Sequence, residues 1–200
     1  SLPEENTDSG KRFVDLLAKT SISAWQILPI TPPNFDSSPY ASTSAFAGYS
    51  KFSSSNEENS MEDENYWLED WALFITIKQA HNNMAWTDWP KELRDRHPKA
   101  MNKWKNNISK EIKMQAQFQH SWLEMKKYAN NKNISLIGDI PIFITHDSAD
   151  VWAHRELFQL DASGYPTHVA GVPPDYFSED GQRWDTVLYN WKSHATEGWR

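Results

Sequence analysis

Residues 136–191 read LIGDIPIFITHDSADVWAHRELFQLDASGYPTHVAGVPPDYFSEDGQRWDTVLYNW, and this stretch decides the fold. Residues 135–144 are almost continuously apolar and rich in isoleucine, which predicts a strand buried on both faces, as in a parallel sheet. Asp139 interrupts this run, and a charge there is costly unless it is paired or hydrogen-bonded. It is either a structural carboxylate, satisfied by backbone or a buried arginine, or a residue at the carboxyl end of a barrel strand that faces a site.

The residues after this strand predict short elements. Asp147 is suited to cap a short helix, with Asp150 in its first turn. Two short strands are expected at 158–160 and 165–169, with turn residues between them.

Residues 171–184, GVPPDYFSEDGQRW, predict a long loop that is stiffened by two prolines and studded with aromatic residues. Such a loop is more often a binding loop than a spacer. Aromatic faces beside amide and carboxylate groups suit sugar rings, whose C–H faces stack and whose hydroxyls need polar partners. The alternative is a packed surface loop without a ligand.

Composition excludes several classes of function. Lysine and arginine number 20 and aspartate and glutamate 27, and the net charge of −7 argues against a nucleic-acid partner. Cysteine is absent, so we expect no disulfide or thiolate metal site and a reducing, cytoplasmic location. No apolar run approaches the ~20 residues that span a bilayer, so no membrane partner is expected. Eleven tryptophans, with 7 tyrosines and 9 phenylalanines, fit a protein that stacks on flat ligands, among which carbohydrate is common.

The first fifty residues predict half of a βα repeat followed by a long loop. Residues 11–20 have the spacing of a helix, and residues 24–30, AWQILPI, that of a buried strand. Residues 31–50 are polar and rich in Pro, Ser and Gly, which allows a flexible linker. Their four aromatic residues argue against a linker. Their place after a strand's carboxyl end is where α/β barrels hold their sites.

The middle of the chain predicts helices. An acidic segment at 57–70 leads into a helix in which Trp67, Trp71, Phe74 and Lys78 mark one face, a stripe expected in the core. A second, long helix is expected over about 98–128, with Pro98 in its first turn. Two helices in a row break a simple alternation of strands and helices, and such a pair could be an independent interaction module.

Several motifs taken together resemble one known family. In order they are WQILP, SSPYASTSAFAG, TDWPKELRDRHP, GDIPIFI, DSADVWAH, ELFQLD, VAGVPPDYFSEDGQRW and LYNW. This series resembles the amylomaltases, which are 4-α-glucanotransferases and are also called disproportionating enzymes. The resemblance implies part of a (β/α)8 TIM barrel, an incomplete one, in which 1–200 is the N-terminal portion of a single catalytic domain and 57–130 a helical insertion.

The resemblance also implies an activity, which is transfer of α-1,4-glucan segments to glucose or another glucan without a cofactor or metal. A retaining mechanism needs two carboxyl groups about 5 Å apart. The family's nucleophile segment, G-x-R-I-D-H, is absent from this sequence. The chain is therefore expected to carry the substrate-binding half, with an α-1,4-glucan or maltooligosaccharide as ligand. The alternative is an inactive carbohydrate-binding fragment or a decayed copy of the enzyme.

Three site residues near the reacting bond are carried over from the family pattern. Ser38 and Tyr40 match positions that line the cleft near the scissile bond, and Tyr40 would stack on or hydrogen-bond a glucose ring. Asp139 matches a residue near the donor sugar that supports the catalytic group without being the nucleophile.

Four further residues come from the 171–184 loop. Gln182 and Trp184 match positions that contact the glucan chain. Tyr176 and Phe177 would shape a lid that keeps water from the glycosyl unit.

The sequence departs from the family at three places. The Gly-rich entry that the family has before its first helix is degraded here to PEENTDSG. Ser37 replaces a usual Asp, with Asp36 one position earlier, and Phe35 replaces a usual Tyr. The family pattern W-G-N-P-L-Y is here W-D-T-V-L-Y at 184–189, and losing Gly and Pro changes the conformations open to the backbone. We expect either a changed glucan preference or lost activity.

Overall fold

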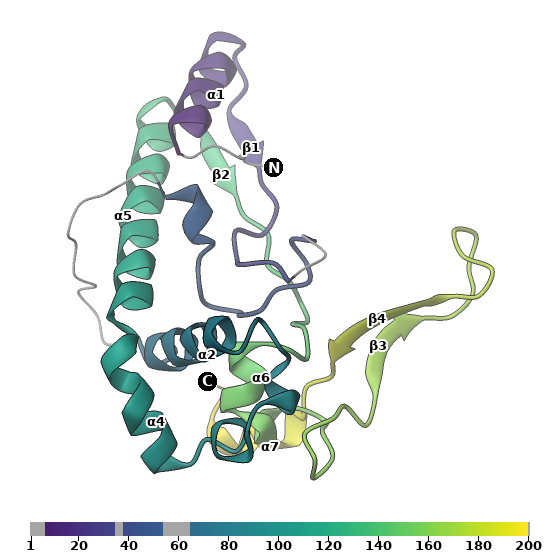
Figure 1. Cartoon of the computed structure of the whole chain (residues 1–200). Helices are drawn as coiled ribbons and strands as arrows, with labels where there is room; N and C mark the ends of the chain where they lie inside the picture. The colour runs from purple at the N-terminus through teal and green to yellow at the C-terminus, as the bar shows by residue number, and fades with distance from the viewer. Residues whose placement is uncertain (1–6, 35–37, 54–64, 200) are drawn as a thin grey trace.

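The computed structural model describes residues 7–34, 38–53 and 65–199, and Figure 1 shows the chain from end to end. The departures at Phe35, Asp36 and Ser37 lie outside the described residues. The elements of these described residues are, in chain order, α1 (Thr7–Lys19), β1 (Ala24–Gln26), η1 (Ser50–Phe52), α2 (Leu68–Ala80), η2 (Trp86–Asp88), α3 (Lys91–Arg94), α4 (Pro98–Trp104), η3 (Lys105–Asn107), α5 (Ser109–Asn131), β2 (Ser135–Ile137), α6 (Ala149–Ala153), η4 (Arg155–Leu157), β3 (Val169–Val172), β4 (Gln182–Val187) and α7 (Trp191–Glu197), where α marks helices, β strands and η 3-10 turns.

The strands β1 and β2 form a short parallel pair although more than a hundred residues separate them. Ala24 pairs with Ser135 and Gln26 with Ile137. Helices α1 and α5 lie beside this pair (Figure 1), as in a strand-and-helix layer of a barrel. The fold is α/β, and the chain forms an incomplete (β/α)8 barrel.

The strand predicted over 135–144 is shorter than expected. β2 ends at Ile137, and the side chains of Ile140 and Ile142 are exposed. Over residues 138–143 no described segment pairs with the backbone, so this part of the chain is not buried on both faces; pairing resumes at Ile144 and Thr145. The strand predicted over 24–30 likewise ends at Gln26, although Ile27 is buried.

The long helix predicted over 98–128 is wrong, because the chain turns between α4 and α5. Pro98 does lie in the first turn of α4, as predicted. The break contains Asn106 and Asn107, whose side chains compete with the backbone for hydrogen bonds and weaken a helix interior. The turn also buries Ile108 against the helices of the middle region.

The buried side chains form two clusters that α5 connects. The larger cluster, the α2–α6 core, holds the predicted Trp71 and Phe74 together with Ile77, Trp86 and Trp152. The smaller, the α1–α5 core, is built from residues of α1, β1, α5 and the start of the segment leading to β2: Val14, Leu17, Trp25, Ile27, Met125, Ala129 and Ile134. The aromatic stripe of α2 is therefore core, as the spacing predicts.

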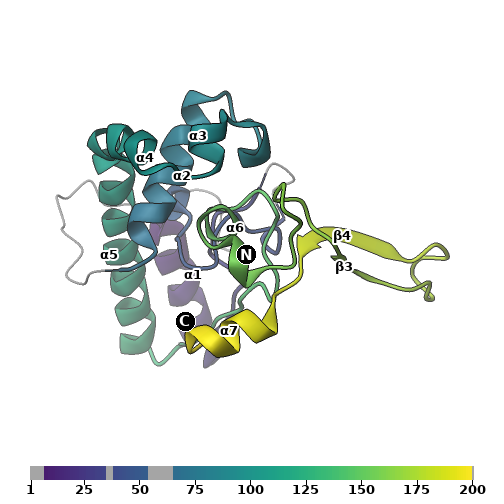
Figure 2. The same cartoon turned by 90° about the horizontal axis from the view of Figure 1, so that it is seen from below.

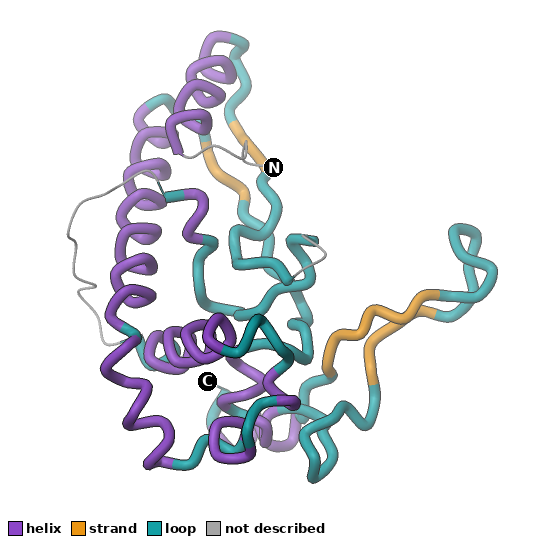
Figure 3. Tube along the Cα trace, in the orientation of Figure 1, coloured by secondary structure: helices purple, strands orange, loops and turns teal. Residues whose placement is uncertain are grey.

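The long loop predicted over 171–184 is an antiparallel hairpin. β3 and β4 form an arm that projects from the body, which Figure 2 shows from below, and its strands are the second orange pair in Figure 3. A Cβ at Gly171 would lie 2.4 Å from the carbonyl oxygen of Gln182, so the strands approach this closely only with glycine there. The strands predicted at 158–160 and 165–169 are isolated bridges, apart from Val169, which begins β3.

The predicted cap of α6 is also wrong by one residue. The N–H of Val151 donates to Ser148 Oγ at 3.3 Å, whereas Asp147 forms an ion pair with Lys78. Asp150 lies in the first turn, as predicted. Within the described ranges no helix has the length and apolar character needed to cross a membrane.

Candidate functional site

A groove of about 600 Å³ opens where the loop after β1, the segment after β2 and the base of β4 meet. It brings together four of the seven predicted site residues, which are Ser38, Tyr40, Asp139 and Trp184. The other lining residues are Ala41, Ile140, Pro141, Ile142, Phe143 and Thr186. The walls are therefore aromatic and aliphatic, with a few polar groups, which is the usual make-up of a small-ligand site.

Tyr40 and Asp139 are joined directly in this groove. The Tyr40 hydroxyl donates to Asp139 Oδ2 at 2.8 Å. This hydrogen bond raises the pKa of Tyr40, because the phenol proton is held by the carboxylate. The Tyr40 N–H also donates weakly to Ser38 Oγ at 3.4 Å. The partner that Asp139 needed is thus a tyrosine of the same groove rather than a buried arginine.

The two loops that carry these residues are tied together behind the groove. The N–H and the hydroxyl of Thr145 both donate to the carbonyl oxygen of Ser42 at 3.0 Å. The N–H of Ala149 donates to Thr43 O at 2.9 Å, and the N–H of Ala45 donates to the Asp150 carboxylate at 3.2 Å. Burial raises the pKa of Asp150. These bonds fix the position of Tyr40 relative to Asp139.

The arm contributes Gln182 and Trp184, which lie two residues apart in β4 and so point to the same face. Trp184 Nε1 donates to Gln182 Oε1 at 3.1 Å. Trp184 lines the groove and Gln182 does not.

The structure does not bring Tyr176 and Phe177 into the groove. Their side chains are 97% and 88% exposed in the loop that joins β3 to β4. The two rings pack edge to face with centroids 5.7 Å apart. A lid role for them therefore requires the arm to bend over a ligand.

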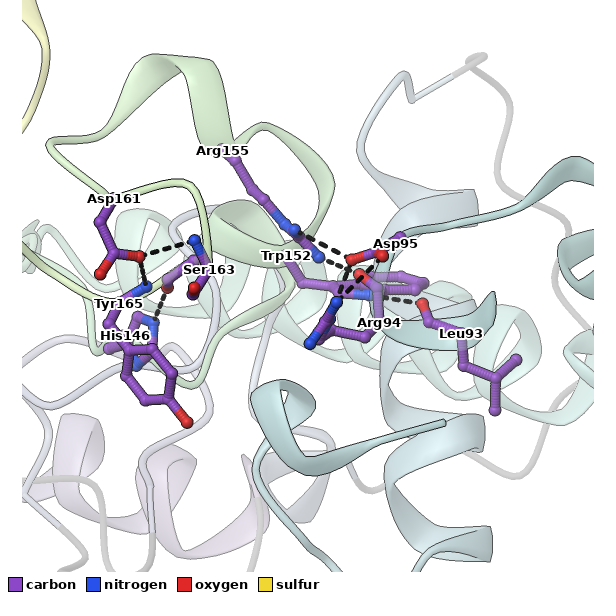
Figure 4. A network of polar contacts seen from close by, with 10 residues as sticks. Leu93, Arg94, Asp95, His146, Trp152, Arg155, Asp161, Ser163 and Tyr165 are labelled. Atoms are coloured by element: carbon purple, nitrogen blue, oxygen red, sulfur yellow. Dashed lines mark hydrogen bonds and ion pairs between the residues drawn. The ribbon is translucent and has the colours of Figure 1, made fainter. Parts of the chain in front are cut away.

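A polar network, drawn in Figure 4, holds the segment that follows β2. Asp95 accepts from Arg94 Nε at 2.9 Å and from Arg155 Nη1 at 3.3 Å, and the hydrogen bonds from Arg94 lower the pKa of Asp95 to about 2. Trp152 Nε1 donates to Leu93 O at 3.1 Å. The network fastens α6 and η4 to the end of α3. Its partners are about sixty residues apart in the sequence, so no short sequence motif predicts these contacts.

The groove offers limited chemistry by itself. Asp139 is the one carboxylate among its lining residues within the described part of the chain. Retaining glycosyl transfer requires two carboxyl groups about 5 Å apart. Over the same residues no group of three or more His, Asp or Glu side chains could hold a metal ion.

Comparisons with known proteins agree on one family. The sequence model described as 4-alpha-glucanotransferase matches residues 5–59 and 49–200. The 4-alpha-glucanotransferase of Thermus thermophilus is 36% identical, over 93% of this chain and 48% of that protein. The corresponding protein of Aquifex aeolicus is 32% identical, over 96% of this chain and 51% of that protein. The chain thus spans about half the length of the curated relatives it matches.

A solved structure agrees with this comparison. The amylomaltase from Streptococcus agalactiae, solved in complex with acarbose, superimposes with a TM-score of 0.87 and 30% identity. The match covers 100% of this chain and 53% of that chain.

The alignments also show a shortened segment that sequence inspection missed. The Thermus alignment runs over 241 positions, whereas 93% of 200 residues is 186, so about 55 positions of that relative have no counterpart here. The two matches to the family model overlap at 49–59, which indicates that the shortening lies between η1 and α2.

Proposed function

Since this chain belongs to the 4-alpha-glucanotransferase family, we propose that it forms the substrate-binding half of an enzyme that transfers α-1,4-glucan segments to glucose or another glucan. The observation that carries the proposal is the groove in which Ser38, Tyr40, Asp139 and Trp184 converge. The mechanism is retaining double displacement in the cytoplasm. Residues 57–130, of which 57–64 lie outside the described residues, form an insertion that is helical over much of its described part.

The groove supplies two kinds of contact that a glucose unit needs. The half-exposed rings of Tyr40 and Trp184 offer faces on which a sugar ring stacks. The Asp139 carboxylate and the Ser38 hydroxyl offer partners for sugar hydroxyls. Tyr40 occupies one acceptor site of the Asp139 carboxylate, which leaves its other acceptor sites for hydroxyls of the glucan.

Asp139 supports the reaction without performing it. Its carboxylate lies beside the sugar and stabilises the orientation of the donor ring. The nucleophile and the acid/base come from the part of the enzyme that follows the matched half. This division explains why the described groove holds one carboxylate where the reaction needs a pair.

The test is binding of maltoheptaose to this chain, measured by calorimetry. We expect saturable binding that weakens about two- to twelvefold in Tyr40→Ala and in Trp184→Ala, because a stacked ring contributes about 0.5–1.5 kcal/mol. Trp191→Ala is the matched control, since Trp191 is exposed but does not line the groove. Absence of binding, or equal weakening in the control, would overturn the proposal.

A second candidate function is an inactive carbohydrate-binding protein. The shortened segment before α2 and the Asp185-Thr186-Val187 departure favour it. The discriminating assay adds the C-terminal half of a relative to this chain and supplies maltotriose. Glucose with longer chains supports the transferase, and unchanged maltotriose with intact binding supports the inactive protein.

The lid proposed for Tyr176 and Phe177 is tested in the same complete enzyme. We expect deletion of residues 173–180 to raise hydrolysis relative to transfer, because water then reaches the glycosyl intermediate. An unchanged ratio of free glucose to transfer product would contradict the lid.

A further inference from the structure

Thr186 lines the groove, and its hydroxyl is left without a partner. The residue is 7% exposed and lies in the groove wall with Tyr40, Asp139 and Trp184. Its Oγ1 atom is covered by this chain's own atoms and has no hydrogen-bond partner among the described residues. Because an unpartnered buried hydroxyl is costly, one in the wall of a binding groove points to a ligand that supplies the partner.

The backbone holds Thr186 where the walls of the groove join. β4 ends at Val187, where the arm meets the body (Figure 1). Thr186 forms an antiparallel bridge with Thr145, whose hydroxyl donates to Ser42 O at 3.0 Å in the loop that carries Tyr40. The backbone is therefore fixed, while the side chain turns about its Cα–Cβ bond between staggered positions.

Threonine stands here in place of another polar residue. The family pattern W-G-N-P-L-Y has asparagine at this position, whereas this chain reads W-D-T-V-L-Y. Asparagine carries a separate donor and acceptor, and threonine carries one shorter group that is both. The hydroxyl and methyl groups of threonine are similar in size, so rotation about χ1 exchanges them with little change in packing.

Trp184 determines which part of a glucan lies beside this hydroxyl. Both residues line the groove from β4, so a sugar ring stacked on the Trp184 indole lies next to Thr186. The edge of such a ring carries hydroxyls, and each of them donates and accepts, as the threonine hydroxyl does.

We propose that Thr186 determines specificity in the groove, and that its hydroxyl turns toward a bound glucan and hydrogen-bonds the ring stacked on Trp184. The identity of this ligand rests on the proposed function. A site that hydrogen-bonds a substrate hydroxyl discriminates against ligands that lack one there, because its own polar group is then left unpaired.

The experiment measures maltoheptaose binding by calorimetry and stability by urea unfolding for two substitutions of one residue. Thr186→Val keeps the shape and removes the hydroxyl, so it should bind about fivefold more weakly while being at least as stable as the unsubstituted chain. Thr186→Ser keeps the hydroxyl and removes a buried methyl, so it should retain most of the affinity although it is less stable. A residue that only packs would give the same order of the variants in both measurements.

Thr76→Val is the matched control. The Oγ1 atom of Thr76 in α2 is also buried without a partner among the described residues, but Thr76 does not line the groove. This variant should leave maltoheptaose binding unchanged.

A double variant tests which ring Thr186 contacts. In the Trp184→Ala background, Thr186→Val should weaken binding less than twofold, because the ring is no longer held beside the hydroxyl. A fivefold loss in both backgrounds would overturn the assignment of this ring.

Two further results would overturn the inference. They are equal affinities of Thr186→Val and the unsubstituted chain, and a loss in Thr186→Ser as large as the loss in Thr186→Val. Weaker binding in Tyr40→Ala with unchanged binding in Thr186→Val would overturn this inference and leave the proposed function standing. Absence of maltoheptaose binding by the unsubstituted chain would overturn both.

Discussion

Lys78 brings an ammonium group into the α2–α6 core, where 4% of its surface is exposed and Asp147 is its partner. Its Nζ also donates to Met84 O at 3.1 Å. Removing one member of a buried pair leaves the other charge uncompensated, so we expect Lys78→Met to lower the free energy of unfolding by about 3 kcal/mol. Urea unfolding measures this change.

The matched control for Lys78 is Lys105→Met. Lys105 pairs with Glu69 at 2.7 Å, but both side chains are exposed. Solvent screens such a pair, so its loss should cost less than about 1 kcal/mol. Equal effects of the two variants would show that the Lys78 pair is not held in the core.

Asp95 gives a prediction about pH. Its pKa is about 2 in the folded chain, below its ordinary value of 3.8, chiefly because of the hydrogen bonds from Arg94. A carboxyl with a lowered pKa stabilises the folded state above its unfolded pKa, and this contribution is lost as the pH falls towards 2. Asp95→Asn should therefore lower the free energy of unfolding by about 0.5–1 kcal/mol at pH 7 and by less at pH 3.

The measurement for Asp95 is urea unfolding of both proteins between pH 7 and pH 3. The raised pKa of Asp150 acts in the opposite direction, but it is common to both proteins and cancels in their difference. A difference that stays constant or grows towards pH 3 would contradict the assignment.

At the level of elements, prediction succeeded where the signal is local. The spacing in α1 and the aromatic stripe of α2 lie within one helix each, and both were found. The ends of β2 depend on which strands pair with it, and an apolar run in the sequence does not show which strands these are. The hairpin of β3 and β4 was missed for the same reason, since its pairing joins residues about ten to eighteen apart.

For the candidate site too, local motifs could be predicted from the sequence and long-range contacts could not. Ser38, Tyr40, Asp139 and Trp184 were identified by resemblance, and the structure places them in one groove. The contacts that fix the groove join residues such as Ser42 and Thr145, which are about a hundred positions apart. No local pattern marks these contacts, so sequence reasoning could name the lining residues but not what holds them.

The base of the arm differs from the family pattern in a way that changes its anchoring. The N–H of Val187 donates to Ile144 O at 3.3 Å, and the family's proline at this position could not donate. We expect Val187→Pro to speed amide exchange in β4 roughly fivefold, the effect of losing about 1 kcal/mol. Val187→Ala keeps the N–H and should leave exchange in the outer part of β4 unchanged. Equal effects of the two variants would contradict the role of the Val187 N–H in anchoring the arm.

The molecule as a whole rests on two cores of unequal size. The α2–α6 core buries more and larger side chains than the α1–α5 core, which lies beside a two-stranded sheet. Ala24, Gln26, Ser135 and Ile137 are exposed, so one side of this sheet is open to solvent. Regions with fewer buried contacts open at a lower free-energy cost than the whole protein. The α1–α5 core should therefore open first, although α5 runs through both.

Substitutions in the two cores test this order of opening. Met125 and Ile77 are each fully buried, one in each core. Met125→Ala should cost about 3 kcal/mol and speed amide exchange around Trp25 while leaving exchange around Trp152 unchanged. Ile77→Ala should speed exchange around Trp152. If each variant sped exchange in both cores equally, α5 would couple them into one cooperative unit, and the half barrel would unfold as a single body rather than from its open sheet.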